Sequence, residues 1–254
     1  MKYKWTGIAC VFALAVVLAT GCGTARNEKE DIAAQTAETG EEAESLEVDP
    51  EVMASQDEGA EDYFIDGDGN LVNEEGDSQE VVLDVSEQLT GTHHAMMRIV
   101  DYGTIELELD ADTAPITVTN FVKLVQEHFY DGLTFHRIIE KYMMQGGDPN
   151  GDGTGGSEET IKGEFANNGI ENDISHTRGT ISMARTSDPD SASSQFFIMQ
   201  ADTPFLDGDY AAFGHVTEGM EIVDAICGDS APTDDNGTIP KEEQPVIEKI
   251  WMID

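Results

Sequence analysis

The amino-acid sequence predicts a mainly β domain that closes into a barrel and carries two helices. Short strand-like segments recur from residue 91 onward, and glycine-rich turns separate them. Only two segments place apolar residues at the three- and four-residue spacings of a helix. Many short strands with so few helices favour a closed barrel, because closure removes the exposed edges of a sheet.

The clearest strand covers residues 100–110, where apolar and acidic side chains alternate. Ile105, Leu107 and Leu109 are expected on one face, and the acidic residues between them on the other. A period of two is typical of a strand that has one face on the core and one in water.

The first helix is expected to begin at Pro115, close to the position where proline is favoured in a first turn. Thr113 is the expected cap, and the helix is expected to end near Phe129, before a turn at 131–132. The apolar residues at helical spacing are Val118, Phe121, Val122 and Val125.

Shorter elements make up the rest of the domain. A second helix is expected at 219–227, through Met220, Val223 and Ile226. The closing strand is expected at 246–253, where apolar residues alternate again. The other strand-like runs are 134–139, 143–146, 180–184, 195–200 and 210–216.

Charge limits the possible partners. The 254 residues include 13 Lys and Arg against 52 Asp and Glu, a formal net charge of −39. A protein that binds nucleic acid needs a positive face toward the phosphates, so DNA and RNA are not expected partners. Three cysteines are too few for a disulfide framework.

The acidic residues also define a linker. Residues 23–90 contain 22 acidic and 2 basic side chains, and their only aromatic residues are Tyr63 and Phe64. Such a segment cannot bury enough apolar surface to offset the loss of chain entropy on ordering. The expected organisation is a targeting segment at 1–21, an acidic disordered linker at 22–90 and a globular domain at 91–254.

The N-terminal segment has the features of an export signal. Lys2 and Lys4 precede an uncharged run to Thr20 that is short for a membrane span. The run ends in Ala-Thr-Gly-Cys, which resembles the bacterial lipobox, although Ala19 stands where leucine is usual. Cys22 would then be lipidated and would anchor the protein on a bacterial cell membrane, outside the cytoplasm. The alternative is an ordinary signal peptide or a short anchor with an incidental cysteine.

Five motifs in the domain carry a family resemblance. The run FHRIIEKYMMQGGDPNGDGTGG at 135–156 resembles the signature of the cyclophilins, which are peptidyl-prolyl isomerases. The motifs that follow, in the family's order, are SMAR at 182–185, SQFFIM at 194–199, FLDGDYAAFGHV at 205–216 and EGMEIVDAI at 218–226. The resemblance covers 95–254. It implies an antiparallel barrel of about eight strands, a helix over each open end and a substrate groove on the outside.

The implied reaction needs few chemical groups. Rotation about an X-Pro bond meets a barrier of ~18–20 kcal/mol, because the amide loses its resonance in the twisted state. No bond breaks and no proton leaves, so no cofactor is expected. Catalysis needs a site that fits the twisted amide better than either planar isomer. Arg137 matches the family's catalytic arginine, whose guanidinium would donate to the prolyl nitrogen as its lone pair localises.

The resemblance also implies the substrate pocket. Met143, Phe197 and Leu206 match the apolar wall that takes the proline ring, and Gln145 matches the glutamine that supports Arg137. The other matched positions along the groove are Tyr142, Ala184, Arg185, Gln195, Phe205 and Tyr210.

Some of these positions depart from the common pattern of the family. Tyr142 stands where many members have Phe, Phe205 where many have Trp, and Tyr210 where His is common. The loop 185–193 cannot be matched residue by residue. Because Phe205 offers no indole N–H, any binding of cyclosporin is expected to be weak.

No metal site is expected. The six histidines show no metal-binding spacing. Residues 148–159 fit the calcium-loop pattern D-x-[DN]-x-[DN]-G-x₅-E, but a strand-like and a turn-like segment replace the two flanking helices that such a loop needs. Residues 64–75 fit the pattern only in part, since Phe64 stands at the first ligand position.

The resemblance therefore favours a membrane-tethered, monomeric isomerase that acts on proline-containing polypeptides, chiefly unfolded exported proteins. One alternative is a chaperone or surface module that binds such peptides with little catalysis. A second is an acidic surface protein that buffers calcium, which rests on charge and the two loops alone. The joint presence of Arg137, Met143, Gln145 and Phe197 favours the enzyme.

Overall fold

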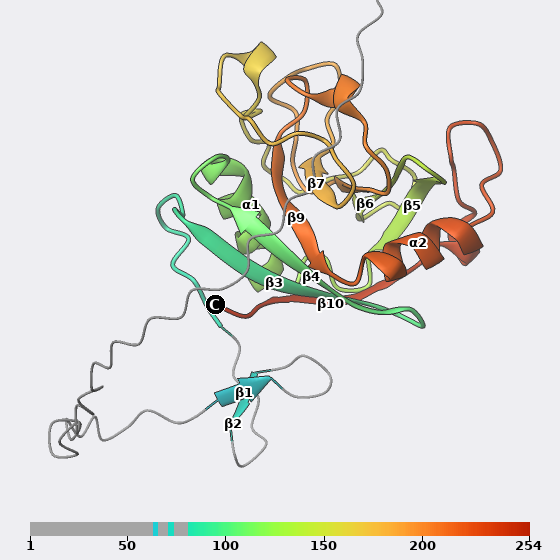
Figure 1. Cartoon of the computed structure of the whole chain (residues 1–254), viewed down its shortest axis with the longest axis horizontal. Coiled ribbons are helices and arrows are strands. Elements are labelled where there is room, and N and C mark those ends of the chain that lie inside the picture. Colours follow the sequence, from blue (N-terminus) through green and yellow to red (C-terminus); the bar gives the residue numbers. More distant parts are fainter. Residues whose placement is uncertain (1–62, 66–70, 74–80) are drawn as a thin grey trace, which may run out of the picture. The chain divides into compact units, whose positions relative to one another are not determined.

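The structure is a computed structural model that describes residues 63–65, 71–73 and 81–254. Within residues 81–254, eight strands form one antiparallel sheet, together with two α-helices and three short 3-10 helices (Figure 1). The strands are β3 (Thr92–Ile99), β4 (Gly103–Asp110), β5 (Thr134–Ile139), β6 (Met143–Asp148), β7 (Thr180–Met183), β8 (Phe196–Met199), β9 (Ala212–Glu218) and β10 (Ile247–Met252). The helices are α1 (Pro115–Gln126), α2 (Met220–Asp229) and the 3-10 helices Ala166–Asn168, Pro204–Leu206 and Lys241–Glu243.

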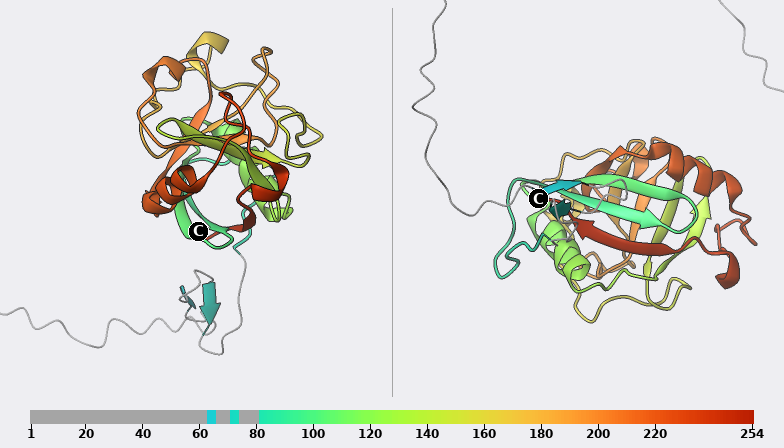
Figure 2. Two further views of the ribbon diagram at one scale, coloured as in Figure 1. Left: turned by 90° about the vertical axis from the view of Figure 1, so that its right-hand side faces the viewer. Right: turned by 90° about the horizontal axis from the view of Figure 1, so that it is seen from below.

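The sheet runs in the order β10-β3-β4-β9-β7-β8-β6-β5 and curls round on itself (Figure 2). Its end strands, β10 and β5, approach each other at an isolated bridge between Thr134 and Val246. The prediction of a closed barrel is therefore wrong in its strict form, because no ladder joins β10 to β5 in the described part of the chain. Pro240 and Pro245 precede β10 and have no N–H to donate, so an irregular segment borders β5 instead of a strand.

Side chains fill the interior of the curled sheet. Ile105, Leu107 and Leu109 are fully buried, which confirms the alternation predicted for β4. In Figure 1, α1 and α2 lie toward opposite ends of the sheet, where α1 contacts β10 and β4 and α2 contacts β4 and β6. Phe121 of α1 meets Phe196 of β8 edge to face, with ring centroids 5.8 Å apart. Because the interior is full, a substrate can bind only on the outer surface.

A distant acid caps α1 in place of the predicted residue. Thr113 donates its hydroxyl to Asp110 at 2.7 Å and makes no cap bond to the helix. Glu164, only 2% exposed, accepts the backbone N–H groups of Ile116 at 3.0 Å and Thr117 at 2.7 Å. A carboxylate there satisfies unpaired N–H groups and complements the helix dipole.

The other predicted helix and strands are confirmed to within a few residues, but β3 has no counterpart among the predicted strands. Its sequence THHAMMRI contains a single β-branched apolar residue, so its β propensity is weak. Ala95, Met97 and Ile99 are nevertheless buried in alternation, because β4 and β10 pair with it on both sides.

Residues 81–90 contact the domain, although their composition places them in the predicted linker. The backbone N–H of Leu83 donates to Gln126 Oε1 at 2.5 Å, and its carbonyl accepts from Gln126 Nε2 at 3.2 Å. The apolar side chains packed against the core are those of Val81, Leu83, Val85 and Leu89. The boundary at residue 90 is therefore wrong, since the globular domain includes 81–90.

Further toward the N-terminus, β1 (Tyr63–Ile65) and β2 (Leu71–Asn73) pair as antiparallel strands. The rest of the predicted linker, the predicted signal segment 1–21 with Cys22 after it, and most of the partial calcium loop at 64–75 lie outside the described residues. In the described part of the chain, no helix combines the length and apolar character that a membrane crossing requires.

Candidate functional site

A groove of about 400 Å³ lies on the outer side of β5, β6 and β8. Nine of the eleven residues predicted to act in catalysis or substrate binding line it: Arg137, Tyr142, Met143, Gln145, Ala184, Arg185, Phe197, Leu206 and Tyr210. The two predicted residues outside the lining are Gln195 and Phe205. Residues from five separate chain segments therefore meet at one surface.

Strand alternation separates the groove from the core. On β6, Met144 belongs to the core while Met143 and Gln145 face the groove, and on β8 Phe196 belongs to the core while Phe197 faces the groove. The apolar side chains on the groove side form a second cluster that consists of Met143, Phe197, Met199 and Leu206, with Ile139, Tyr142, Ala184 and Tyr210 packed against it.

A β-bulge at His136 places Arg137 in the groove. Phe135 pairs with Gly146 and Arg137 pairs with Gln145, which leaves His136 as an extra residue in β5. Because side chains alternate along a strand, one extra residue moves the next side chain to the opposite face. The bulge thus puts the guanidinium on the same face as Gln145.

Fixed partners hold the guanidinium of Arg137. Nη1 donates to Gln145 Oε1 at 3.3 Å, and Nε donates to the carbonyl of Asn236 at 2.7 Å. Gln145 Nε2 donates to Gln195 Oε1 at 2.9 Å, and Gln195 Nε2 donates to the Gly155 carbonyl at 2.7 Å. Gln195 therefore orients Gln145, although Gln195 itself does not line the groove.

Phe205 lies at the rim of the groove. Its side chain is 73% exposed, and its ring centroid is 6.1 Å from that of Tyr142. The short helix Pro204–Leu206 turns Leu206 toward the apolar cluster and leaves its neighbour in water.

Arg185 supports the groove wall. Its guanidinium carbon lies 4.8 Å from the ring centroid of Tyr210 and 5.0 Å from that of Phe165, and its Nε donates to the Asp209 carbonyl at 2.8 Å. The Tyr210 ring in turn meets the Phe197 ring edge to face at 5.7 Å. The cation–π contact with Arg185 helps to fix the position of the Tyr210 ring.

The groove includes residues that sequence reasoning missed: His136, Asp152, Gly153, Asn236 and Thr238. The turn signal Asp-Asn-Gly at 235–237 could have marked a loop, but nothing in it indicates a contact with a strand 99 residues away. Neither ring nitrogen of the buried His136 has a hydrogen-bond partner. Burial lowers the pKa of His136, so the ring is neutral at neutral pH.

The second half of the signature run forms a compact loop. Asp148 is buried, its Oδ1 accepts the N–H of Asn150 at 2.8 Å, and its Oδ2 accepts those of Asp152 and Gly153 at 3.1 and 2.6 Å. Asp148, the first residue of the calcium-like pattern, therefore accepts hydrogen bonds from the backbone of its own loop. Among the described residues, no group of three His, Cys, Asp or Glu side chains is arranged to hold a metal ion.

Comparison with protein families identifies the domain. The family model for cyclophilin type peptidyl-prolyl cis-trans isomerase/CLD matches residues 94–250. A peptidyl-prolyl cis-trans isomerase of Acinetobacter baylyi is 43% identical over 153 residues, which are 57% of this chain and 78% of that protein. Peptidyl-prolyl cis-trans isomerase B of Bacillus subtilis is 44% identical over 142 residues, which are 56% of this chain and 90% of that protein.

Solved structures agree with the sequence comparison. The crystal structure of a cyclophilin type peptidyl-prolyl cis-trans isomerase from Cryptosporidium parvum matches with a TM-score of 0.57 and 26% identity, over 65% of this chain and 99% of that one. A second structure of that protein, in the presence of the dipeptide Ala-Pro, matches with a TM-score of 0.56 and 28% identity, over 63% of this chain and 99% of that one.

Proposed function

Because the chain belongs to the cyclophilin-type peptidyl-prolyl cis-trans isomerase family, we propose that it catalyses X-Pro isomerisation with Arg137 as the catalytic residue. The isomerase activity is that of the family. The observation that carries the role of Arg137 is its guanidinium, held by Gln145 and Asn236 at the edge of an apolar pocket.

The mechanism follows from what changes as the amide twists. In a planar amide the nitrogen lone pair is delocalised and accepts hydrogen bonds poorly. In the twisted state the lone pair localises on the prolyl nitrogen, and a nearby guanidinium N–H can donate to it. Because Arg137 makes this bond chiefly in the twisted state, the bond lowers the barrier and does not merely tighten binding.

Arg137 keeps donors for this role. A guanidinium has five N–H donors, and Gln145 and Asn236 each accept one of them. These two partners fix the plane of the guanidinium before a substrate arrives. Little reorganisation is then needed in the transition state, which is the basis of electrostatic preorganisation.

The apolar cluster beside Arg137 suits a proline ring. Met143, Phe197 and Leu206 present apolar atoms to the groove with Tyr142 and Tyr210 next to them. A relative crystallised in the presence of the dipeptide Ala-Pro supports proline-containing peptides as the ligands. The proline ring would enter this pocket, so that the bond before it lies beside Arg137.

The cellular part of the proposal extends the predictions from the sequence. The enzyme is a monomer, tethered to a bacterial membrane through lipid on Cys22, and it accelerates the folding of exported proteins. The lipobox-like end of the apolar run at 1–22 and the acidic stretch after it support this placement. Cyclosporin would bind weakly, since Phe205 at the groove rim offers no N–H.

An isomerisation assay separates this proposal from a peptide-binding chaperone. The full chain is added to a short Ala-Pro peptide, and cis-trans exchange is followed by NMR. Uncatalysed exchange takes ~10–100 s, so an isomerase brings exchange into the range that NMR detects directly. Peptide binding by a folded protein without faster exchange would instead identify a binding module.

A further inference from the structure

His176 lies behind the wall of the apolar pocket and has no role in the mechanism above. It is 1% exposed, and its ring stacks on that of Phe197 with centroids 5.9 Å apart and planes 18° apart. The Tyr210 ring meets it at a steep angle, with centroids 6.4 Å apart. Since Phe197 and Tyr210 both line the groove, His176 is the support on which two groove residues rest.

Both nitrogens of the His176 ring have partners. Nδ1 lies 2.9 Å from Asp207 Oδ1, and Nε2 lies 3.0 Å from the hydroxyl of Ser182. A carboxylate only accepts, so Nδ1 donates to Asp207, and the Ser182 hydroxyl donates to Nε2. Ser182 is on β7 and Asp207 directly follows the short helix Pro204–Leu206, so the ring is fixed from two different elements.

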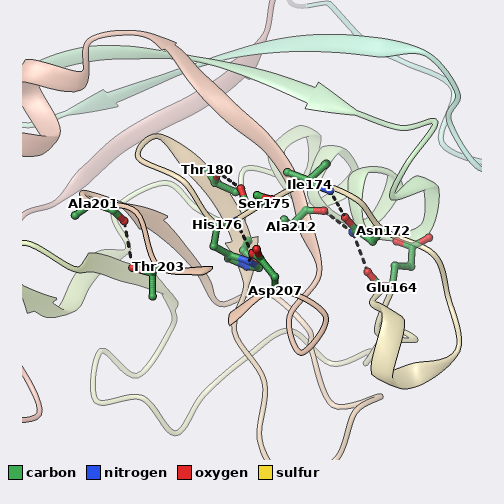
Figure 3. Close-up of polar contacts among 11 residues, drawn as sticks. Glu164, Asn172, Ile174, Ser175, His176, Thr180, Ala201, Thr203, Asp207 and Ala212 are labelled. Carbon is green, nitrogen blue, oxygen red and sulfur yellow. Dashed lines mark hydrogen bonds and ion pairs between the residues drawn. The ribbon is translucent and has the colours of Figure 1, made fainter. Parts of the chain in front are cut away.

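Figure 3 shows His176 beside Asp207. The backbone of His176 is fixed as well. Its N–H donates to Asp207 Oδ1 at 2.7 Å, and its carbonyl accepts the N–H of Thr203 at 2.7 Å. Next to it, the Thr180 hydroxyl donates to the Ser175 carbonyl at 2.9 Å. Asp207 thus receives two N–H groups from one residue, and the turn that carries Leu206 is tied to His176.

The protonation states of His176 and Asp207 favour the hydrogen bond from Nδ1 to the carboxylate. Burial lowers the pKa of His176, and its bond to Asp207 only partly opposes that effect, so the ring is neutral at neutral pH. Burial acts to raise the pKa of Asp207, but the hydrogen bonds from His176 outweigh it and the pKa is lowered. A neutral ring that donates to an ionised carboxylate is therefore the stable state.

We propose that His176 is a positioning residue of this enzyme, which holds Phe197, Tyr210 and Leu206 in the shape that receives the proline ring. The proposal rests on the proposed function, because it assigns that pocket to proline. His176 acts only through its neighbours and touches no reacting atom. A wall that contacts the proline ring contacts it equally in planar and twisted states, so its loss weakens binding and leaves the chemical step unchanged.

The test compares kcat and KM among full-length variants on a short Ala-Pro peptide. Asp207→Ala removes the acceptor of both His176 N–H groups, so KM is expected to rise roughly five- to tenfold while kcat stays within about twofold. Asp207→Asn keeps an oxygen for the same two donors and is expected to restore a KM close to that of the wild type. Asp202→Ala is the matched control, since this acid on the same turn accepts the backbone N–H of Arg178 at 2.9 Å and has no bond to His176.

A second variant tests the ring itself. His176→Asn can keep a donor for Asp207 but removes the ring that Phe197 stacks on, and it is expected to raise KM as Asp207→Ala does. If Asp207→Ala does not fold, Ser182→Ala gives the corresponding comparison, because it removes only the bond to Nε2.

The outcomes are distinct. Simple destabilisation lowers the active fraction, and hence the apparent kcat, at an unchanged KM. An unchanged KM in folded Asp207→Ala and His176→Asn, or an equal rise in Asp202→Ala, overturns the role of His176. Failure of the wild type to accelerate exchange would instead overturn the proposed function.

Discussion

Arg137 and Gln145 are directly paired residues of β5 and β6, and Arg137 Nη1 donates to Gln145 Oε1 across that pair at 3.3 Å. The amide of Gln145 has a set direction, because its Nε2 donates to Gln195. A bulge at His136 makes this pairing possible, since without it Arg137 would face the interior. A local irregularity in one strand thus creates the proposed catalytic geometry.

The cap of α1 predicts a large effect on stability. Glu164→Ala leaves the N–H groups of Ile116 and Thr117 without their acceptor in a buried position. We expect the free energy of unfolding to fall by about 2–4 kcal/mol, as measured by urea denaturation. The control is Glu159→Ala, because Glu159 is exposed and only pairs with Lys123 at 3.4 Å. An equal loss in both variants would show that the cap has no special role.

Two buried histidines predict that stability falls in mild acid. The pKa values of His136 and His176 lie below the ordinary 6.5, chiefly because both rings are buried. The unfolded chain therefore binds more protons below about pH 6.5, so the free energy of unfolding falls as pH drops from there toward the folded pKa values. His94 acts in the opposite direction: its pKa is raised, chiefly by its bond to Asp254, and its contribution is lost as pH rises through the folded value.

His136→Leu isolates one of these contributions. The variant removes a titrating ring whose two nitrogens have no partner, so at pH 7.5 it should be at least as stable as the wild type. Its loss of stability between pH 7.5 and 5.5, measured by urea denaturation at both pH values, should be smaller than that of the wild type. The same loss in both proteins would mean that folding does not lower the pKa of His136.

The groove rim predicts the effect of a single aromatic substitution on cyclosporin. Phe205→Trp adds an indole N–H at an exposed site beside Tyr142. One added neutral hydrogen bond contributes about 0.5–1.5 kcal/mol, so binding should tighten by roughly 2- to 12-fold in titration calorimetry. Equal affinity of wild type and variant would remove Phe205 from the ligand site.

The predicted lipidation of Cys22 predicts where the protein is found in a cell. If Cys22 carries lipid, Cys22→Ser should move the protein from the membrane fraction to the soluble fraction, because stable anchoring needs two or more acyl chains. Cys10→Ser, within the preceding apolar run, is the matched control and should leave the protein in the membrane. A Cys22→Ser protein that still pellets with membranes would indicate an uncleaved anchor.

Much of the fold was predictable because strand alternation and helical spacing are local signals. Ile105, Leu107 and Leu109 indicate their strand without knowledge of any partner. The strand Thr92–Ile99 lacks such a signal, since most of its side chains are His, Met and Ala, and it is defined instead by pairing with a strand on each side. Strict closure of the barrel fails for a reason that is visible only in the assembled sheet, where Pro240 and Pro245 lie at the seam.

The site, like the fold, has a part that the sequence predicts and a part that it does not. Residues inside the five motifs, such as Met143 and Phe197, could be placed in the groove through the family resemblance. The contact that Asn236 makes with Arg137 could not be placed in this way, because its carbonyl comes from a loop 99 residues away in the sequence. The packing of 81–90 was not predicted for another reason. The acidic composition of 23–90 predicts a disordered linker, although Val81, Leu83, Val85 and Leu89 of that stretch pack against the core.

The most direct test of the account is the kcat/KM of Arg137→Ala for X-Pro exchange, measured beside Arg178→Ala. Arg178 is the matched control, since its guanidinium bonds Asp224 in two places at 2.7 Å and does not line the groove. Circular dichroism first establishes that both variants are folded. We expect Arg137→Ala to lose roughly 10²-fold or more of kcat/KM, and Arg178→Ala to keep the wild-type value. A folded Arg137→Ala protein with wild-type activity would contradict the proposed role of Arg137.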